Sequence, residues 1–146
     1  MPKRLIKDIL AQRHLISADK NMTVRAACRL MAGNKIGALL VLEDQKILGI
    51  FTERDALNKI LAAGLDPDKT LLAQVMASEP QTIRANKPLA YALHMMAEGG
   101  FRHVPVVDED GLAIGMVSAR DALGQDIVEL ERDMKRLEAL ESSIGY

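Results

Sequence analysis

The stretch GIFTERDAL, Gly49 to Leu57, is written a second time as GMVSARDAL, Gly115 to Leu123. Each copy places a glycine, a hydroxyl residue, an arginine and an aspartate at the same spacing, directly after an apolar run. A hydroxyl followed by an acid three residues later, ahead of an apolar segment, is typical of a capping box at the start of a helix. The sequence therefore predicts one helix start that occurs twice in the fold.

The similarity extends outward from the two copies to most of the chain. An offset of 65 residues aligns Met31 with Met96 and Val41 with Val106, and one extra residue near Asp110 moves the offset to 66. Two units of roughly 60 residues are too few for a solenoid. The pattern predicts two halves that close on each other about a pseudo-twofold axis.

Each unit is predicted to run strand, helix, strand, strand, helix. Apolar residues at helical spacing predict the first helix of each unit. Thr23 is a plausible cap for one and Pro88 suits the first turn of the other, while Gly33 with Asn34 and Gly99 with Gly100 are predicted to end them. The predicted strands cover 14–18, 37–44 and 46–52 in the first half and 81–85, 102–110 and 112–118 in the second, with short helices over 4–12 and 71–77.

The predicted fold class is α+β, with the same order of elements in both halves. The predicted division of the chain is a helical segment over 1–13, a first repeat over 14–64, a linker with a short helix over 65–79, a second repeat over 80–130 and a helical extension over 131–146.

The C-terminal segment is predicted to be a long amphipathic helix. Its apolar residues follow each other in steps of four and three, with charged residues on the other face. They are Leu123, Ile127, Leu130, Met134 and Leu137. Two interpretations stay open: the helix lies back on its own half, or it contacts a second copy through a short coiled-coil seam. Glu141 interrupts the heptad, so a long coiled coil is not supported.

Composition excludes several classes of function. The formal charge is −1 and no run of basic residues occurs, so a nucleic-acid partner is not expected. No segment approaches the roughly 18 consecutive apolar residues of a membrane span, and the basic start does not continue into a signal peptide. The single Cys28 excludes an intramolecular disulfide framework, which favours a cytoplasmic location. Three scattered histidines and one cysteine give no metal-ligand spacing.

Two interpretations compete for the repeated motif. Capping explains Thr52 and Ser118 with their acids, but not the repeated arginines, since a cation in the first turn opposes the helix dipole. It also leaves the repeated glycines unexplained, which permit close backbone approach. A ligand site accounts for all four positions. A helix N-terminus with a hydroxyl and an arginine suits a phosphate, and a carboxylate suits a ribose 2′,3′-diol. The predicted ligand is a ribonucleotide.

The residues that carry these arguments also resemble a known family. IGALLVLED followed by GIFTERDAL in the first half, and FRHVPVVDEDG followed by GMVSARDAL in the second, are similar to the tandem cystathionine-β-synthase (CBS) domain pair, the Bateman module. The resemblance covers about residues 5 to 130. It implies two pseudo-symmetric β-α-β-β-α repeats packed as one module, here with an extended C-terminal helix. Similar proteins bind AMP, ADP, ATP, S-adenosylmethionine or NAD-type molecules in two clefts between the repeats, and many form disc-like homodimers.

Carried over position by position, the resemblance implies two nucleotide sites. The first would use Asp121 and Ser118 for ribose, Arg120, Arg102 and His103 for phosphate, and Ile16 with Ile36, Gly37 and Ala38 for adenine. The second would use Asp55, Thr52, Arg54, Gln81, Phe101, Arg102 and His103. The first half carries Gly37 and Ala38 where the second has Arg102 and His103, with only Lys35 close by. We therefore expect the Asp121 site to be the tighter one for phosphorylated ligands.

The sequence predicts a regulatory protein that makes no covalent chemistry, because no nucleophile with a base, metal cluster or pair of catalytic acids is evident. It would bind an adenosine nucleotide as a regulatory ligand and pass its state to an effector protein or to its own homodimer, to which the C-terminal helix would contribute. The alternative is a ligand-free interaction or scaffold protein in which both motifs are only helix caps.

Overall fold

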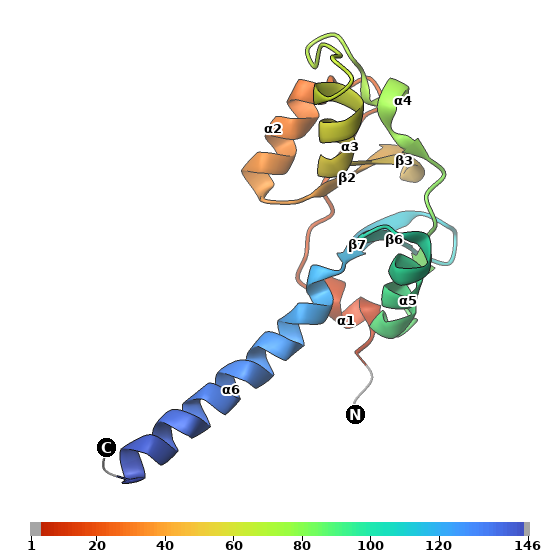
Figure 1. Cartoon of the computed structure of the whole chain (residues 1–146). Coiled ribbons are helices and arrows are strands. Elements are labelled where there is room, and N and C mark those ends of the chain that lie inside the picture. The colour runs from red at the N-terminus through yellow and green to blue at the C-terminus, as the bar shows by residue number, and fades with distance from the viewer. Residues whose placement is uncertain (1–3, 145–146) are drawn as a thin grey trace.

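A computed structural model describes residues 4–144, with the side chains of residues 125–129 left out (Figure 1). The predicted α+β class, the two matching halves and the long C-terminal helix are confirmed. The first half contains β1 (Ser17–Ala18), α2 (Val24–Asn34), β2 (Ala38–Glu43), β3 (Lys46–Thr52), α3 (Glu53–Asp55) and the π-helix η1 (Ala56–Leu61). The second contains β5 (Ile83–Arg84), α5 (Leu89–Gly99), β6 (His103–Val107), β7 (Ala113–Ser118) and α6 (Arg120–Ile144). Three further elements are α1 (Ile6–Leu10), α4 (Leu72–Val75) and β4 (Ala77–Ser78).

Each half is built on its own sheet. In the first, β1 runs parallel to β2, which pairs antiparallel with β3, and β4 is added antiparallel at the far edge of β3. In the second, β5 runs parallel to β6, which pairs antiparallel with β7. The registers agree: Val41 faces Gly49 in one sheet and Val106 faces Gly115 in the other, and each sheet is irregular directly after this pair. The repeat seen in the sequence is therefore a repeat of strand pairing.

The two short helices are exchanged between the halves. Ile6 of α1 is fully buried in the core of the second half, whereas Leu72 of α4 is fully buried in the core of the first. Backbone hydrogen bonds hold both in equivalent places: the Ile6 N–H donates to the Lys87 carbonyl, and the Leu72 N–H donates to the Met22 carbonyl. Each half therefore depends on a helix that lies outside its own stretch of chain.

The halves meet through apolar side chains of their sheets. Ala38, Leu40 and Ile50 are buried, and Met116 and Ala113 of β7 pack against them. This contact places the starts of β2 and β6 next to each other, with both repeated helix starts at the edge of the interface. The site described below lies at this edge.

The first helix of each half ends where the sequence places its end, at Asn34 in α2 and at Gly99 in α5. Thr23 caps α2, since its side chain accepts the Ala26 N–H, as predicted. The helix continues through Gly33 and ends at Asn34, as predicted, and Lys35 takes the left-handed conformation at φ 55° directly after it. In α5 the left-handed residue is Gly100, and Pro88 precedes the helix instead of lying in its first turn.

The repeated glycines make room for protein packing. A Cβ at Gly49 would lie 2.7 Å from the Ala77 carbonyl oxygen of β4, and one at Gly115 would lie 2.8 Å from the Leu10 side chain of α1. The expectation that these glycines serve the approach of a ligand is therefore wrong at Gly49, where a neighbouring strand takes the space.

Helix α6 projects away from both halves (Figure 1). Every residue from 130 to 144 is exposed, so over this range the helix does not lie back on its own half. Ile127, which the predicted stripe includes, falls among the side chains outside the description. None of the helices in residues 4–144 has both the length and the apolar character that crossing a bilayer requires.

Candidate functional site

A cavity of about 1050 Å³ opens between the two halves, beside the start of α6. Its lining comes from the segment between α1 and β1, the end of α2, the start of β2, the start of β6, strand β7 and the first turn of α6. A space of this size accommodates a molecule as large as a mononucleotide. Because both halves contribute, its shape depends on how they pack.

The structure brings all nine residues predicted for the Asp121 site into this cavity. Those that line it are Ile16, Ile36, Gly37, Ala38, Arg102, His103, Ser118, Arg120 and Asp121. The sequence places them far apart, in the two starts of the strand pairs and the second helix start. Their convergence follows from the pseudo-symmetric packing, since each half supplies the wall that faces the other half's motif.

The carboxylate of Asp121 is the most buried charged group of the lining, with 6% of its side chain exposed. Its Oδ2 accepts the Ser118 N–H at 2.8 Å, which is the acidic half of the predicted capping box. Burial acts to raise the pKa of Asp121, but the hydrogen bonds from Arg13 and from the Ser118 amide together hold the pKa below its ordinary value. Asp121 is therefore an anion inside the cavity at neutral pH.

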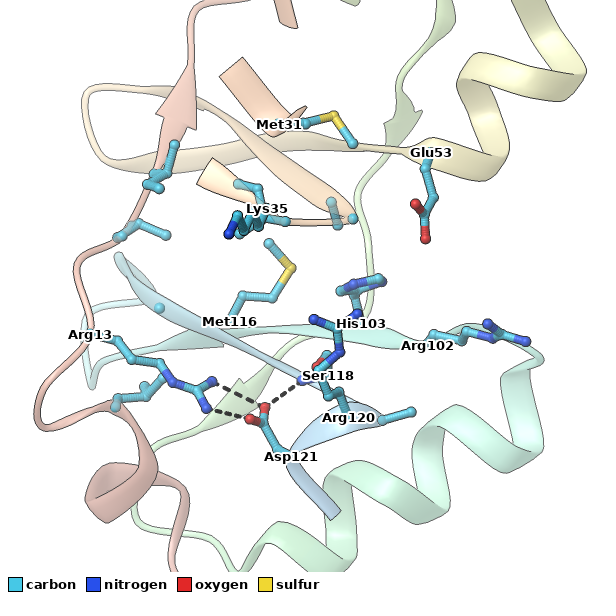
Figure 2. Close-up of a pocket in the computed structure, with 18 of the residues that line it drawn as sticks. Arg13, Met31, Lys35, Glu53, Arg102, His103, Met116, Ser118, Arg120 and Asp121 are labelled. Carbon is cyan, nitrogen blue, oxygen red and sulfur yellow. Dashed lines mark hydrogen bonds and ion pairs between the residues drawn. The ribbon is translucent and has the colours of Figure 1, made fainter. Parts of the chain in front are cut away.

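Arg13 is the functional residue that the sequence did not reveal. Its guanidinium donates to both carboxylate oxygens of Asp121, through Nη1 at 3.1 Å and through Nη2 (Figure 2). Its side chain is 46% exposed, because it reaches in from the segment that crosses between α1 and β1. The position aligned with Arg13 in the other half is Ser78, so comparison of the repeats gives no signal for this pair.

A second arginine of the N-terminal segment fixes the same turn. Arg4 donates from Nη1 to the backbone carbonyl of Asp121 at 2.6 Å. The start of α6 is further tied to β6, because the Ala119 N–H donates to the Arg102 carbonyl at 2.9 Å. These bonds hold the first turn of α6 in place.

His103 lies at the boundary between the halves, at the start of β6. Its imidazole is close to Gly37, where an added Cβ would lie 3.6 Å from the ring and 3.0 Å from the Glu53 carboxylate. Burial is the main cause that lowers the pKa of His103 below 6.5, and the nearby Arg102 and Arg120 lower it further, against the opposing effect of Glu53 and Asp121. The ring is therefore neutral near pH 7.

The rest of the charged lining is mostly basic. Apart from the ion pair of Arg13 with Asp121, the cavity is lined by three basic side chains and one carboxylate. The basic residues are Lys35, Arg102 and Arg120, and the carboxylate is that of Glu53. Lys35 reaches this cavity because it terminates α2 in the left-handed conformation just before β2. An excess of cations around a partly enclosed space favours an anionic occupant.

The residues predicted for a second site are arranged differently. Asp55 and Thr52 form a complete capping box, with Asp55 Oδ2 accepting the Thr52 N–H and Thr52 Oγ1 accepting the Asp55 N–H. The Asp55 carboxylate also lies 3.4 Å from Lys59. Phe101 packs against the core of the second half, and Arg54 points to the Gly100 carbonyl at 3.5 Å. None of these four predicted residues lines the cavity at Asp121, and neither does Gln81, which is exposed, whereas Arg102 and His103 do line it.

The chemistry offered by the cavity is recognition. A buried carboxylate with paired donors accepts two hydrogen bonds from a vicinal diol, and guanidinium groups bind phosphate oxygens. Among the described residues no cluster of three or more His, Cys, Asp or Glu side chains has the geometry to hold a metal ion. Cys28 lies in the apolar core of the first half, where burial raises the pKa of its thiol, so it is not an activated nucleophile.

Comparison with known proteins identifies the family of both halves. The family model described as "CBS domain" matches residues 6–62 and 72–128. The "CBS domain-containing protein CBSCBSPB3" of Arabidopsis thaliana is 32% identical over 143 residues, which cover 97% of this chain. The chain spans 25% of the length of that relative.

Solved structures of similar fold include proteins with bound adenosine compounds. The CBS domain protein PAE2072 of Pyrobaculum aerophilum, complexed with AMP, matches with a TM-score of 0.74 and 27% identity over 80% of this chain and 88% of its own. The CBS domain pair of protein MJ0100, in complex with 5-methylthioadenosine and S-adenosyl-L-methionine, matches with a TM-score of 0.76 and 26% identity over 88% of this chain and 99% of its own.

Proposed function

The chain belongs to the CBS domain family, and from this membership we propose that it is a regulatory protein that binds an adenosine nucleotide in the cavity at Asp121. The observation that carries the proposal is the position of the Asp121 carboxylate, buried in a cavity lined from both halves and surrounded by basic side chains. The ligands named for PAE2072 and for the MJ0100 pair are adenosine compounds, which supports the class of ligand.

Binding at this site requires an exchange of hydrogen-bond donors. Arg13 occupies both oxygens of Asp121, and a ribose offers two hydroxyl donors in its place. The exchange costs little, because a half-exposed arginine forms a weaker ion pair than a buried one and regains water on release. The displaced guanidinium stays at the cavity mouth, where it adds to the attraction for phosphate.

The basic side chains that line the cavity also favour some adenosine ligands over others. Lys35, Arg102 and Arg120 attract the phosphates of AMP, ADP, ATP or NAD, whereas S-adenosylmethionine carries a sulfonium cation that they repel. We therefore propose an anionic nucleotide as the preferred ligand of the Asp121 site. The Asp55 side carries fewer cations and its carboxylate is engaged by Lys59, so weaker binding of phosphorylated ligands is proposed there.

In this proposal the protein performs no catalysis and works in the cytoplasm. Ligand binding between the halves changes how they pack, and the change is passed to a homodimer partner or to a separate effector protein. A nucleotide shifts such an equilibrium only if it binds the two arrangements with different affinity. The cavity meets this condition in principle, because its walls belong to both halves.

One observation favours a second candidate function. Both acids of the repeated motif already make protein contacts, Asp55 in a full capping box and Asp121 with Ser118 and Arg13. An interaction or scaffold protein whose motifs serve only as caps would show the same contacts.

Calorimetry separates the two candidates. The purified chain is titrated with AMP, ATP, NAD and S-adenosylmethionine, and the titrations are repeated with Asp121→Asn, which keeps the size of the side chain. A sensor gives saturable heat with the anionic nucleotides and loses it in the variant. Absence of heat with all four ligands in the native chain, after removal of any co-purified nucleotide by unfolding and refolding, supports the scaffold.

A further inference from the structure

The exposed apolar stripe of α6 has no partner within the described part of the chain. We define the stripe as Leu130, Met134, Leu137 and Ile144, whose side chains are 60 to 64% exposed on a helix that projects from the body (Figure 1). Leu123 begins the same line near the cavity, and Leu140 widens it on one side. Leucine-type residues repeated every three and four positions on a free helix are typical of a surface that another helix covers.

Carboxylates border the stripe on both sides. With Leu130 and Leu137 at d positions of a heptad, Glu131 and Glu138 take the e positions and Asp133 takes a g position. Glu141 falls within the seam itself, at an a position. The basic residues of this part of the helix, Arg132, Lys135 and Arg136, fall at outer positions away from the stripe. The two edges that a partner helix would contact are therefore acidic.

This charge pattern opposes pairing of α6 with a second copy of itself. In a parallel pair Asp133 of one helix faces Glu138 of the other, and Glu141 faces its own counterpart. In an antiparallel pair e positions face e positions and g positions face g positions, which again brings acids together. Like charges at these positions are destabilising in either direction. An anionic membrane surface is disfavoured for the same reason.

We propose that the stripe of α6 is a docking surface for a helix of another protein, one with an apolar a/d face bordered by lysine or arginine. Such a helix buries the leucines and places a cation opposite Glu131, Asp133 and Glu138. The e and g charges set partner choice and orientation in coiled coils, so the acidic edges select a basic partner and reject a second copy. The inference concerns a surface remote from the cavity and does not rest on nucleotide binding. It assigns α6 to a different partner from the homodimer that the sequence suggested.

The full chain is tested against two synthetic helices of about four heptads, both with leucine at a and d. One carries lysine at e and g, and the other glutamate. Fluorescence anisotropy of the labelled peptides measures affinity. The proposal expects binding of the lysine peptide and, for the glutamate peptide, affinity weaker by about tenfold or more, because three attractive contacts become repulsive. Equal affinity for both peptides, or no binding of the lysine peptide, overturns the proposal.

Variants of the chain locate the binding on α6. Leu130→Glu with Leu137→Glu is expected to abolish binding, while Arg132→Glu on the outer face makes the chain more acidic and is expected to leave affinity within about twofold. A triple variant, Glu131→Lys with Asp133→Lys and Glu138→Lys, is expected to prefer the glutamate peptide. Stronger binding by Arg132→Glu, or an unchanged preference in the triple variant, contradicts the assigned edges. All positions are exposed, and thermal melts of each variant check that the body stays folded.

Sedimentation velocity tests the second copy as occupant. The native chain is compared with Leu130→Glu/Leu137→Glu, and the native chain is also mixed with the triple lysine variant. The proposal expects the first two to have the same association state, and the mixture to form an additional heteromeric species, because opposite edges then meet. If the native chain associates and the double glutamate variant does not, a second copy covers the stripe and the proposal is wrong.

Discussion

Arg13 and Asp121 lie 108 residues apart in the sequence and form a two-point ion pair in the cavity between the halves. The arginine comes from the segment that leads from α1 into the first half, and the aspartate begins α6 in the second. The pair therefore couples the carboxylate of the candidate site to the chain segment that connects the halves. Its removal is expected to change stability and ligand preference together.

Arg13→Met is expected to lower the free energy of unfolding by about 1–2 kcal/mol, because the Asp121 charge stays buried with fewer donors. The loss is no larger because water screens this half-exposed ion pair. Denaturant melts measure this loss. The lowered pKa of Asp121 means that its contribution is complete above about pH 4 and disappears as the pH falls through the folded-state pKa. The difference between the native chain and the variant is therefore expected to shrink below about pH 4.

The same variant is expected to bind adenosine more tightly, because the ribose no longer competes with a guanidinium. AMP is expected to gain less, since the displaced arginine no longer helps with the phosphate. The ratio of AMP to adenosine affinity, measured by calorimetry, is the readout, and Arg29→Met on an exposed face of α2 is the control. A weaker affinity for adenosine in Arg13→Met would show that the arginine supports the site instead of competing for it.

Asp121→Asn and Asp55→Asn form a matched pair at the two repeated helix starts. Each loses part of a cap, which costs about 1 kcal/mol of stability, and Asp121→Asn is expected to lose more because it also weakens the ion pair with Arg13. Only Asp121→Asn is expected to lower the affinity of the cavity for AMP. The expected loss is about tenfold or more, because one charge-assisted hydrogen bond to the ribose is lost. Equal losses of affinity in both variants would mean that binding follows stability and not the carboxylate of the cavity.

AMP binding is expected to strengthen as the pH is lowered from about 7.5 to 6.5. His103 is neutral in the free protein because its pKa is lowered, and a phosphate nearby raises that pKa, so binding takes up a proton. The gain is at most about tenfold per pH unit for one proton. Glu53, Asp121, Arg102 and Arg120 also act on the ring.

His103→Gln supplies the control for this pH dependence, because it keeps a polar side chain and removes the titration. The affinity of this variant for AMP is expected to change less with pH than that of the native chain. Adenosine, which has no phosphate, serves as the control ligand. The phosphate of AMP itself titrates near pH 6, so the comparison between the two proteins carries the result. Identical slopes for both would remove His103 from the phosphate site.

Two glycine substitutions are expected to change stability in opposite directions. Gly33→Ala lies within α2, where an added Cβ meets nothing within 4 Å, so it is expected to stabilise by about 0.5–1 kcal/mol. Gly49→Ala would place its Cβ 2.7 Å from the Ala77 carbonyl oxygen and is expected to destabilise by about 1–3 kcal/mol as β3 and β4 separate. Thermal melts of both variants test the pair. A neutral Gly49→Ala would show that β4 moves away without cost.

Most of the fold could be predicted from the sequence because the two copies of the repeat have the same order and pairing of strands. Residues such as Val41 and Val106 occupy equivalent positions in both copies, so one prediction of strand order applied twice. The helix starts at Thr52 and Ser118 followed from capping chemistry, which acts over three residues. Features that depend on neighbouring residues in the chain were therefore accessible.

Features that depend on contacts between non-equivalent segments were not accessible. Arg13 reaches Asp121 only because the segment before β1 passes the start of α6 in the second half, and the position aligned with Arg13 holds Ser78. The space left by Gly49 is taken by β4, which belongs to the segment interpreted as a linker. The ion pair between Asp121 and Arg13 could therefore not be predicted from the spacing of the repeated motif.

The exchanged short helices have a consequence for synthesis. Leu72 of α4 leaves the ribosome soon after the strands it covers, so the first half can close while translation continues. Ile6 of α1 emerges before any strand of either half, yet it packs in the core that β6 and β7 form, and β7 ends at Ser118. Helix α1 must therefore wait until β6 and β7 have been made, and the second half completes its core only when two segments far apart in the nascent chain meet.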